Sequence, residues 1–157
     1  MKQEAMGTSR SEEWETPQAI YDLLDKEFHF QLDPCATDEN AKCDSYYTEE
    51  EDGLKQDWYK YGSVFINPPY GKKTKDWVEK AYKESQKGCT VVMLIFIRSD
   101  TKWWHEWVID KVDEIRMIQG RLTFGGAKNS SPWPSILLVY RPDSHRMKLS
   151  GYYWKRK

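Results

Sequence analysis

The chain has 157 residues, the size of one ordinary domain, which excludes two full domains with separate cores. Its formal net charge of −1 argues against coating of nucleic acid by bulk attraction, which needs clustered Lys and Arg. The longest apolar run, Val91 to Ile97, is far too short to cross a bilayer. The Cys and His residues show no zinc or redox spacing, so we expect no metal and a reduced, intracellular setting.

The sequence divides into a polar leader, one domain and a short tail. Residues 1–12 are polar and predict a disordered leader. The folded domain is expected over residues 13–142, and residues 143–157 are expected to form a basic and aromatic C-terminal extension. The chain contains no internal repeat and no low-complexity tract, so these divisions rest on composition alone.

The first part of the domain predicts one helix and one strand. A helix is expected to run to about Glu27, with Thr16 as its N-cap and Pro17 in its first turn. Apolar and polar residues then alternate over residues 28–33, which predicts a strand. Residues 35–61 show a poor pattern and are expected to be mostly loop, apart from a brief strand at a Tyr-Tyr pair.

The middle of the chain alternates strands and helices. Residues 63–66 predict a short buried strand that runs straight into a Pro-Pro pair. Thr74 is expected to cap a helix that Gly88 closes. Residues 90–97 are β-branched and apolar, as in a central strand buried on both faces, and a Trp-rich core helix follows Ser99 or Thr101.

The last third predicts a hairpin. Residues 115–118 and 135–140 are expected to be strands, joined by a Gly- and Pro-containing loop over residues 120–134. Strands that alternate with helices and end in two consecutive strands indicate an α/β fold. We expect one mostly parallel sheet with a C-terminal antiparallel hairpin.

The tetrapeptide Asn67-Pro68-Pro69-Tyr70 carries the chemistry. Such an Asn/Asp/Ser-Pro-Pro-aromatic sequence arises by chance in less than about 1% of chains of this length. It follows a buried strand, where open α/β sheets place their active sites. A Pro-rich turn with an exposed Tyr is the structural alternative.

Each residue of the tetrapeptide fits methyl transfer to a planar amino group. The amide oxygen of Asn67 and the carbonyl of Pro68 could accept the two amino protons and favour a nitrogen with an available lone pair. Pro68 and Pro69 stiffen the loop before substrate arrives. Tyr70 offers an aromatic face to a base flipped out of the duplex, and such stacking is worth about 1 to 3 kcal/mol.

Several ordered motifs make the chain resemble the small phage-type DNA N6-adenine methyltransferases. Together they cover most of the chain outside its two ends, which is far more specific than any one motif. The resemblance implies a single-domain, Rossmann-like class I methyltransferase with shortened second and third strands. The motifs are residues 13–18 (EWETPQ), 32–36 (LDPCA), 40–43 (NAKC), 52–58 (DGLKQDW), 67–70 (NPPY) and 120–126 (GRLTFGG).

The resemblance implies S-adenosylmethionine as the methyl donor. Thr16 and Pro17 would contact the methionine part of the cofactor. The turn Asp33-Pro34-Cys35-Ala36 would follow the first strand, with Asp33 facing the ammonium group, although Asp before Pro is also a common turn. Asp57 would be the acid near the adenine moiety. The usual Gly-rich cofactor loop is absent, which leaves the ribose contact unassigned among residues 49–52.

Basic residues lie after three of the expected strands and suggest double-stranded DNA as the partner. Segregation from the acids would give a nearly neutral chain one basic face, while ordinary solvated charges are the alternative. The mixed content of residues 120–134, including Trp133, is typical of a base reader. Arg98 could frame the target base or a phosphate, or belong to a helix-capping turn. The candidate DNA-binding residues are Lys72, Lys73, Arg98, Arg121 and Lys128.

The sequence therefore predicts a cytoplasmic, S-adenosylmethionine-dependent DNA methyltransferase of a bacterial or phage-infected cell, acting on adenine N6. Two other enzyme functions remain as alternatives. Methylation of cytosine N4 in DNA is chemically closest to this reaction, and methylation of a protein glutamine side chain would use the same tetrapeptide in the same way. A DNA-binding module that has lost catalysis is the alternative outside the enzymes.

Overall fold

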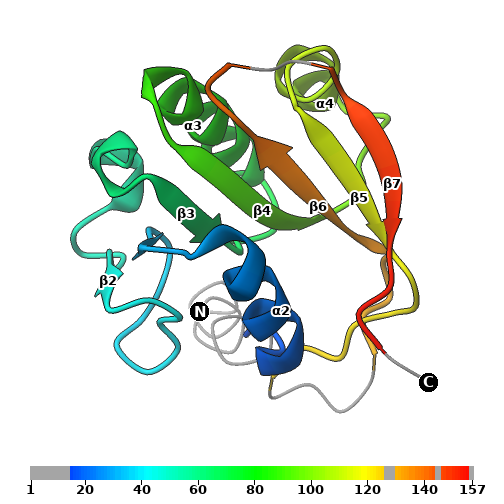
Figure 1. The fold of residues 1–157 in the computed structure, drawn as a ribbon, viewed down its shortest axis with the longest axis horizontal. Helices are drawn as coiled ribbons and strands as arrows, with labels where there is room; N and C mark the ends of the chain where they lie inside the picture. Colours follow the sequence, from blue (N-terminus) through cyan, green and yellow to red (C-terminus); the bar gives the residue numbers. More distant parts are fainter. Residues whose placement is uncertain (1–14, 126–129, 144–145, 156–157) are drawn as a thin grey trace.

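The computed structural model describes residues 15–125, 130–143 and 146–155, in which the chain forms one seven-stranded sheet with helices on both faces (Figure 1). The leader predicted for residues 1–12 lies outside the described residues. The strands are β1 (Leu32–Asp33), β2 (Ser45–Tyr46), β3 (Ser63–Ile66), β4 (Thr90–Phe96), β5 (Glu114–Ile118), β6 (Ser135–Tyr140) and β7 (Lys148–Tyr152). The helices are α2 (Gln18–Phe28), α3 (Thr74–Lys87) and α4 (Lys102–Trp107), with 3-10 turns η1 (Gly53–Lys55) and η2 (Tyr59–Tyr61).

The strand order β2-β1-β3-β4-β6-β5-β7 gives the sheet a switch point. From β1 the chain passes to β2 on one side and then to β3 on the other, so the direction of winding reverses between β1 and β3. Open α/β sheets bind ligands at the carboxyl ends of the strands at such a point. All strand pairs are parallel except the two made by β6, with β4 and β5. The predicted mostly parallel sheet with a C-terminal antiparallel hairpin is confirmed.

The sheet lies between α2 on one face and α3 and α4 on the other (Figure 1), and each face carries an apolar cluster. Helix α2 packs through Ile20 and Leu24 against one face, together with Phe65 and Val92. Helices α3 and α4 cover the other face, where Trp104 is buried and the neighbouring Trp side chains pack at its edge. Strand β4 is buried over Val91–Phe96, which confirms the central strand predicted from its apolar run. Of the three Trp residues predicted to be core, Trp104 is buried, and Trp103 and Trp107 are partly buried against the same cluster.

The strand predicted over residues 28–33 is wrong except at its end. Phe28 still belongs to α2, and His29 ends this helix in the left-handed conformation, with φ of 53°. Phe28 and Phe30 stack on each other and pack against the core cluster of α2. The alternation of apolar residues therefore reflects a helix end and an aromatic pair, and only Leu32–Asp33 form a strand.

Two of the three predicted threonine caps are wrong. Pro17 and Lys73 occupy the N-cap positions of α2 and α3, and neither makes a side-chain cap. The Thr101 hydroxyl does cap α4 by accepting the Trp104 N–H, so the capping turn after β4 is confirmed. Thr16 and Thr74 are instead buried and make hydrogen bonds to the Asn-Pro-Pro-Tyr loop. Both hydroxyls therefore bind the tetrapeptide loop and do not cap a helix.

Strand β7 was not predicted. Lys148–Tyr152 pair in parallel with β5 and form the last strand of the sheet, although the pattern of residues 143–157 showed only basic and aromatic content. No helix in the described part of the chain is long and apolar enough to cross a membrane. Among the same residues, no group of three or more His, Cys, Asp or Glu side chains is arranged to hold a metal ion.

Candidate active site

A cavity of about 530 Å³ lies at the switch point, beside the carboxyl ends of β1 and β3. The lining residues come from residues 15–16 before α2, the turn after β1, the residues around η1, the end of β3 with the tetrapeptide that follows it, and the start of α3. Its size is that of a site for a small molecule or cofactor. The topology therefore places the predicted catalytic loop and the predicted cofactor turn in one cavity.

The side-chain amide of Asn67 is held in one orientation. Its Nδ2 donates to the Thr16 hydroxyl at 3.1 Å, and its Oδ1 accepts from the Tyr70 hydroxyl at 3.4 Å. Thr16 is only 4% exposed, which makes it a fixed anchor. Because the nitrogen is used by Thr16, the amide oxygen is directed to the Tyr70 side of the site. The Asn67 amide oxygen is thus presented as a hydrogen-bond acceptor.

The rest of the tetrapeptide is fixed from the two elements beside it. The Thr74 hydroxyl, in the first turn of α3, donates to the Pro69 carbonyl at 2.8 Å. The Tyr70 ring stacks on Phe96 at the end of β4, with ring centroids 4.0 Å apart and planes 13° apart. Burial raises the pKa of the Tyr70 hydroxyl above its ordinary value, so this group is protonated and donates at neutral pH. The tetrapeptide is thus held by α3 on one side and by β4 on the other.

Asp33, at the end of β1, is a buried carboxylate in the cavity wall. It is 4% exposed, and its two oxygens accept the backbone N–H groups of Cys35 at 3.3 Å and Lys42 at 3.2 Å. Burial raises the pKa of Asp33 to about 7, although both N–H donors and the Lys42 charge oppose this. Each carboxylate oxygen retains a second lone pair. A cationic ligand would therefore find an acceptor whose charge it also stabilises.

The turn after β1 replaces the missing Gly-rich loop. The backbone from Cys35 to Lys42 folds over the Asp33 carboxylate, and Thr37 and Asn40 brace it by reciprocal side-chain to N–H bonds of 2.7 and 3.1 Å. Burial raises the pKa of the Cys35 thiol far above its ordinary value, so it lines the cavity as a neutral group. An Asp-centred turn thus supplies the wall that glycines build in other sheets of this kind.

The structure gathers most of the predicted site residues in this cavity, namely Thr16, Asp33, Pro34, Cys35, Ala36, Asn67, Pro68, Pro69, Tyr70 and Lys73. Pro17 and Asp57 are not among the described residues that line it. The Asp57 carboxylate is half exposed and lies 3.9 Å from the Lys60 ammonium. Lys42 lines the cavity but was not predicted as a site residue. Its ammonium is 3.4 Å from Glu15, and its only sequence signal was its place in a family motif.

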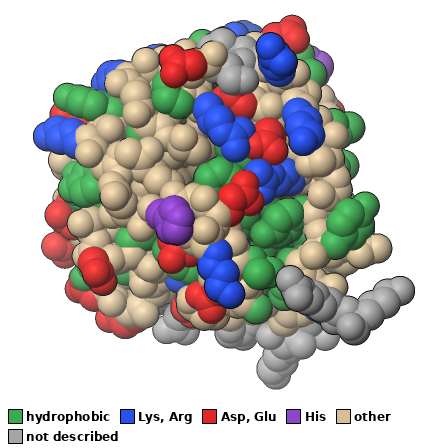
Figure 2. Space-filling view, in the orientation of Figure 1, with side chains coloured by type: hydrophobic (Ala, Val, Ile, Leu, Met, Phe, Trp, Pro, Cys, Tyr) green, Lys and Arg blue, Asp and Glu red, His purple; other side chains and the backbone are tan. Residues whose placement is uncertain are grey.

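The predicted DNA-binding residues that the structure describes come after the carboxyl ends of parallel strands, at the same end of the sheet as the cavity. Lys72 and Lys73 are exposed beyond β3, Arg98 is exposed beyond β4, and Arg121 is exposed beyond β5. Arg98 lies 3.7 Å from Asp100, and Lys128 is outside the described residues. The face drawn in Figure 2 carries acidic and basic side chains side by side, so this face is not uniformly basic.

A Rossmann-like sheet with a ligand cavity at its switch point and an Asn-Pro-Pro-Tyr loop in that cavity is the arrangement of a class I methyltransferase domain. The model of the DNA N-6-adenine-methyltransferase (Dam) family matches residues 4–156, and the chain belongs to this family.

Curated relatives carry the same description. The DNA N-6-adenine-methyltransferase of Escherichia phage T1 is 31% identical over 111 residues, 70% of this chain and 46% of that protein. The chain thus spans about half the length of the phage T1 relative. The DNA N-6-adenine-methyltransferase of Haemophilus phage HP1 is 28% identical over 149 residues, 89% of this chain and 84% of that protein. Among solved structures, a predicted O-methyltransferase from Agrobacterium tumefaciens matches with a TM-score of 0.39 and 19% identity, over 69% of this chain and 52% of that one.

Proposed function

We propose that the chain transfers a methyl group from S-adenosylmethionine to the exocyclic N6 of adenine in double-stranded DNA. Membership of the Dam family supports this reaction. The observation that carries the proposal is that the Asn67 amide and the Asp33 carboxylate line one cavity. An acceptor for an amino group and an acceptor for a cationic ligand are the two groups that such a transfer needs side by side.

The residues of the cavity fit this cofactor. Asp33 would face its ammonium group, with Thr16 and the turn from Pro34 to Ala36 around the methionine part. Glu49 and Asp52 line the cavity beside η1 and are acceptors suited to ribose hydroxyls. When bound, the cofactor supplies the methyl group from its sulfonium.

The protein's own part in the reaction is positioning. The Asn67 amide oxygen and the Pro68 carbonyl accept the two N–H groups of the target amine, which holds its lone pair toward the methyl donor. Tyr70 packs against the flipped base, with its own ring fixed on Phe96. No covalent enzyme intermediate is needed. The amino proton that is lost after transfer leaves by way of solvent.

We assign the contacts with DNA to the end of the sheet at which the cavity lies, beyond the carboxyl ends of the parallel strands. Lys72 and Lys73 follow the catalytic loop directly, and Arg98 and Arg121 follow the next two parallel strands. These cations would neutralise phosphates around the flipped base. We assign sequence recognition to the loop between β5 and β6, of which residues 126–129 lie outside the described residues. Its Trp133 is 58% exposed.

The test is incubation with labelled S-adenosylmethionine and unmethylated duplex DNA, followed by nucleoside analysis. The expected product is labelled N6-methyladenine. Label in N4-methylcytosine would move the target to cytosine, and label in protein alone would contradict a DNA substrate. Absence of S-adenosylmethionine binding would contradict the proposed reaction, and DNA binding in a separate titration would then support a DNA-binding module without catalysis.

Replacing Thr16 by valine is expected to slow methyl transfer about three- to tenfold, because the Asn67 amide loses the acceptor that orients it. Thr16→Ser keeps the hydroxyl and should transfer at nearly the normal rate. The measurement is a single-turnover rate at saturating cofactor and DNA. Equal rates for Thr16→Val and the unmodified protein would show that Thr16 does not orient the amide.

A further inference from the structure

One wall of the cavity is the η1 turn, which packs against the turn after β1. Gly53 begins η1, and a Cβ atom placed on it would lie 2.0 Å from the Pro34 carbonyl oxygen and 3.1 Å from the Trp77 ring. Only glycine permits this approach. Both Gly53 and Pro34 line the cavity, so their contact sets the distance between its two walls at this point.

Trp58 fixes this turn from beneath. Its side chain is completely buried and stacks on Trp77, with ring centroids 6.1 Å apart and planes 20° apart. The indole Nε1 donates to the Gly53 carbonyl at 2.9 Å. A buried donor that loses its acceptor is costly, so this bond ties η1 to the position of the Trp58 ring.

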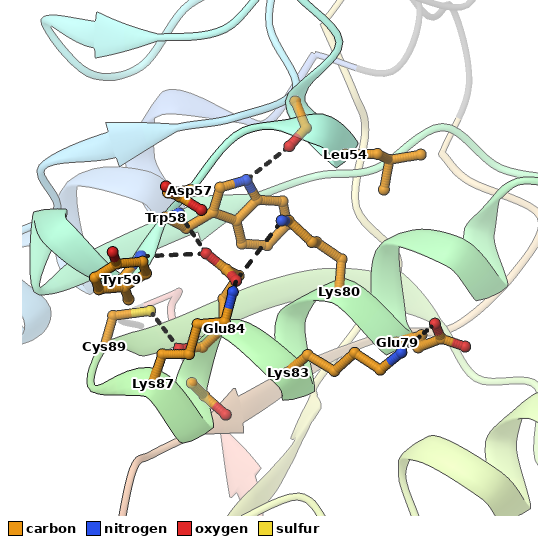
Figure 3. Close-up of polar contacts among 12 residues, drawn as sticks. Leu54, Asp57, Trp58, Tyr59, Glu79, Lys80, Lys83, Glu84, Lys87 and Cys89 are labelled. Atoms are coloured by element: carbon orange, nitrogen blue, oxygen red, sulfur yellow. Dashed lines mark hydrogen bonds and ion pairs between the residues drawn. The ribbon is translucent and has the colours of Figure 1, made fainter.

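Glu84 of α3 fixes Trp58 in turn (Figure 3). Its carboxylate accepts the Trp58 backbone N–H at 2.5 Å and lies 2.8 Å from the Lys87 ammonium. It is 1% exposed, and a second cation, Lys80, lies 3.6 Å away. Burial alone would raise the pKa of Glu84, but the Lys87 hydrogen bond and the Trp58 N–H outweigh it and hold the pKa below its ordinary value. Glu84 is therefore a charged anchor inside the fold.

Helix α3 connects this anchor to the catalytic loop. At its start the Thr74 hydroxyl binds the Pro69 carbonyl, and near its end Glu84 binds Trp58. One rigid helix thus holds the tetrapeptide at one end and the η1 wall at the other. Glu84, Trp58 and the two Lys residues beside Glu84 are not among the cofactor or DNA contacts that the family resemblance implies.

We propose that Glu84, Trp58 and Gly53 form a positioning relay, in which Glu84 on α3 holds Trp58 and Trp58 holds the η1 wall of the cavity at Gly53. This inference rests on the proposed function, because it takes S-adenosylmethionine to be the ligand of the cavity. The three residues act through η1 and do not touch the reacting atoms. The relay therefore acts on cofactor affinity rather than on the chemical step, because the tetrapeptide has its own contacts with Thr16, Thr74 and Phe96.

The test is Trp58→Phe, which keeps an aromatic ring against Trp77 and removes the N–H to Gly53 together with part of the buried indole ring. The expected result is a three- to tenfold rise in Kd and KM for S-adenosylmethionine, about the effect of one lost hydrogen bond, with kcat at saturation within about twofold. Trp107→Phe is the matched control. Trp107 is a half-buried Trp that packs on Tyr82 outside the cavity, and its replacement should leave both constants unchanged.

Each outcome decides between the two proposals. A Trp58→Phe protein with normal Kd and KM, or with a fall in kcat alone, would overturn the relay. A wild-type protein that does not bind S-adenosylmethionine in calorimetry would contradict the proposed function instead. If Trp58→Phe does not fold, Glu84→Gln takes its place, because it keeps an acceptor for the Trp58 N–H and loses the charge. It should raise KM about two- to threefold at constant kcat, and an unchanged KM would overturn the relay.

Discussion

Replacing Asn67 by alanine is expected to lower the rate of methyl transfer about a thousandfold, while the Kd for S-adenosylmethionine changes less than about threefold. The loss of one preorganised hydrogen-bonding group in a reacting site costs roughly 10²- to 10³-fold in rate. Here the remaining acceptor, the Pro68 carbonyl, cannot hold both protons of the amine in place. The cofactor contacts proposed for Asp33 and its turn lie on β1 and stay intact.

The measurement is a single-turnover rate with labelled cofactor, together with calorimetric binding of S-adenosylmethionine. Asn67→Asp is the informative comparison. Because it keeps an oxygen acceptor, it should retain more activity than the alanine variant. Because it loses the Nδ2 donor to Thr16, it should be less active than the unmodified protein. A parallel loss of cofactor binding and thermal stability in Asn67→Ala would mean misfolding, and an unchanged rate would contradict the catalytic role.

The parts of the fold that the sequence predicted correctly are those with a strong local pattern. Residues 63–66 and 90–97 are largely apolar runs bounded by turn residues, and they contain the whole of β3 and β4. Gly88 ends α3 in a positive-φ conformation, as its sequence signal indicated. Burial on both faces of a parallel sheet produces such patterns whatever the rest of the chain does.

The structural predictions that were wrong concern segments whose conformation depends on contacts with residues elsewhere in the fold. Thr16 looks like a helix cap because Pro follows it, yet its hydroxyl accepts from Asn67, a residue 51 positions away in the sequence. The strand expected at residues 28–33 fails because Phe28 and Phe30 stack on each other rather than alternate in a sheet. Strand β7 has no apolar face of its own. Its pairing with β5 defines it, and the sequence does not encode this pairing locally.

Site residues that belong to a recognisable motif could be predicted from the sequence. Site residues that act only by packing against the cavity wall could not. The tetrapeptide and Asp33 stand out as residue types at strand ends. Glu84 and Trp58 do not stand out. A Glu in a helix is usually a surface residue, and a Trp in a loop is usually a core residue. The fold shows that residues 52–54 build part of the cavity wall and that Gly53 packs against Pro34 there. Asp57, chosen within the motif of residues 52–58 as the acid, lies instead beside Lys60.

Binding of S-adenosylmethionine is expected to depend on pH through Asp33. In the ligand-free protein burial raises the pKa of Asp33 to about 7, so the carboxyl group is largely protonated below that pH. A cationic ammonium favours the ionised form and must displace this proton. Affinity for S-adenosylmethionine is therefore expected to be lost as pH falls, by about tenfold in Kd for each pH unit below 7.

Asp33→Asn tests the assignment, because the amide is nearly the same size and cannot ionise. It should weaken cofactor binding about 100-fold at pH 7.5, the effect of removing one partner from a buried charge pair, and its Kd should stay flat between pH 5.5 and 7. Calorimetric titrations in this window avoid the range near pH 8 in which an α-amino group loses its own proton. If both proteins show the same pH dependence, the ionisation that controls binding belongs to another group. If Asp33→Asn binds as tightly as the wild type, Asp33 serves only to fold the turn from Cys35 to Lys42 over its oxygens.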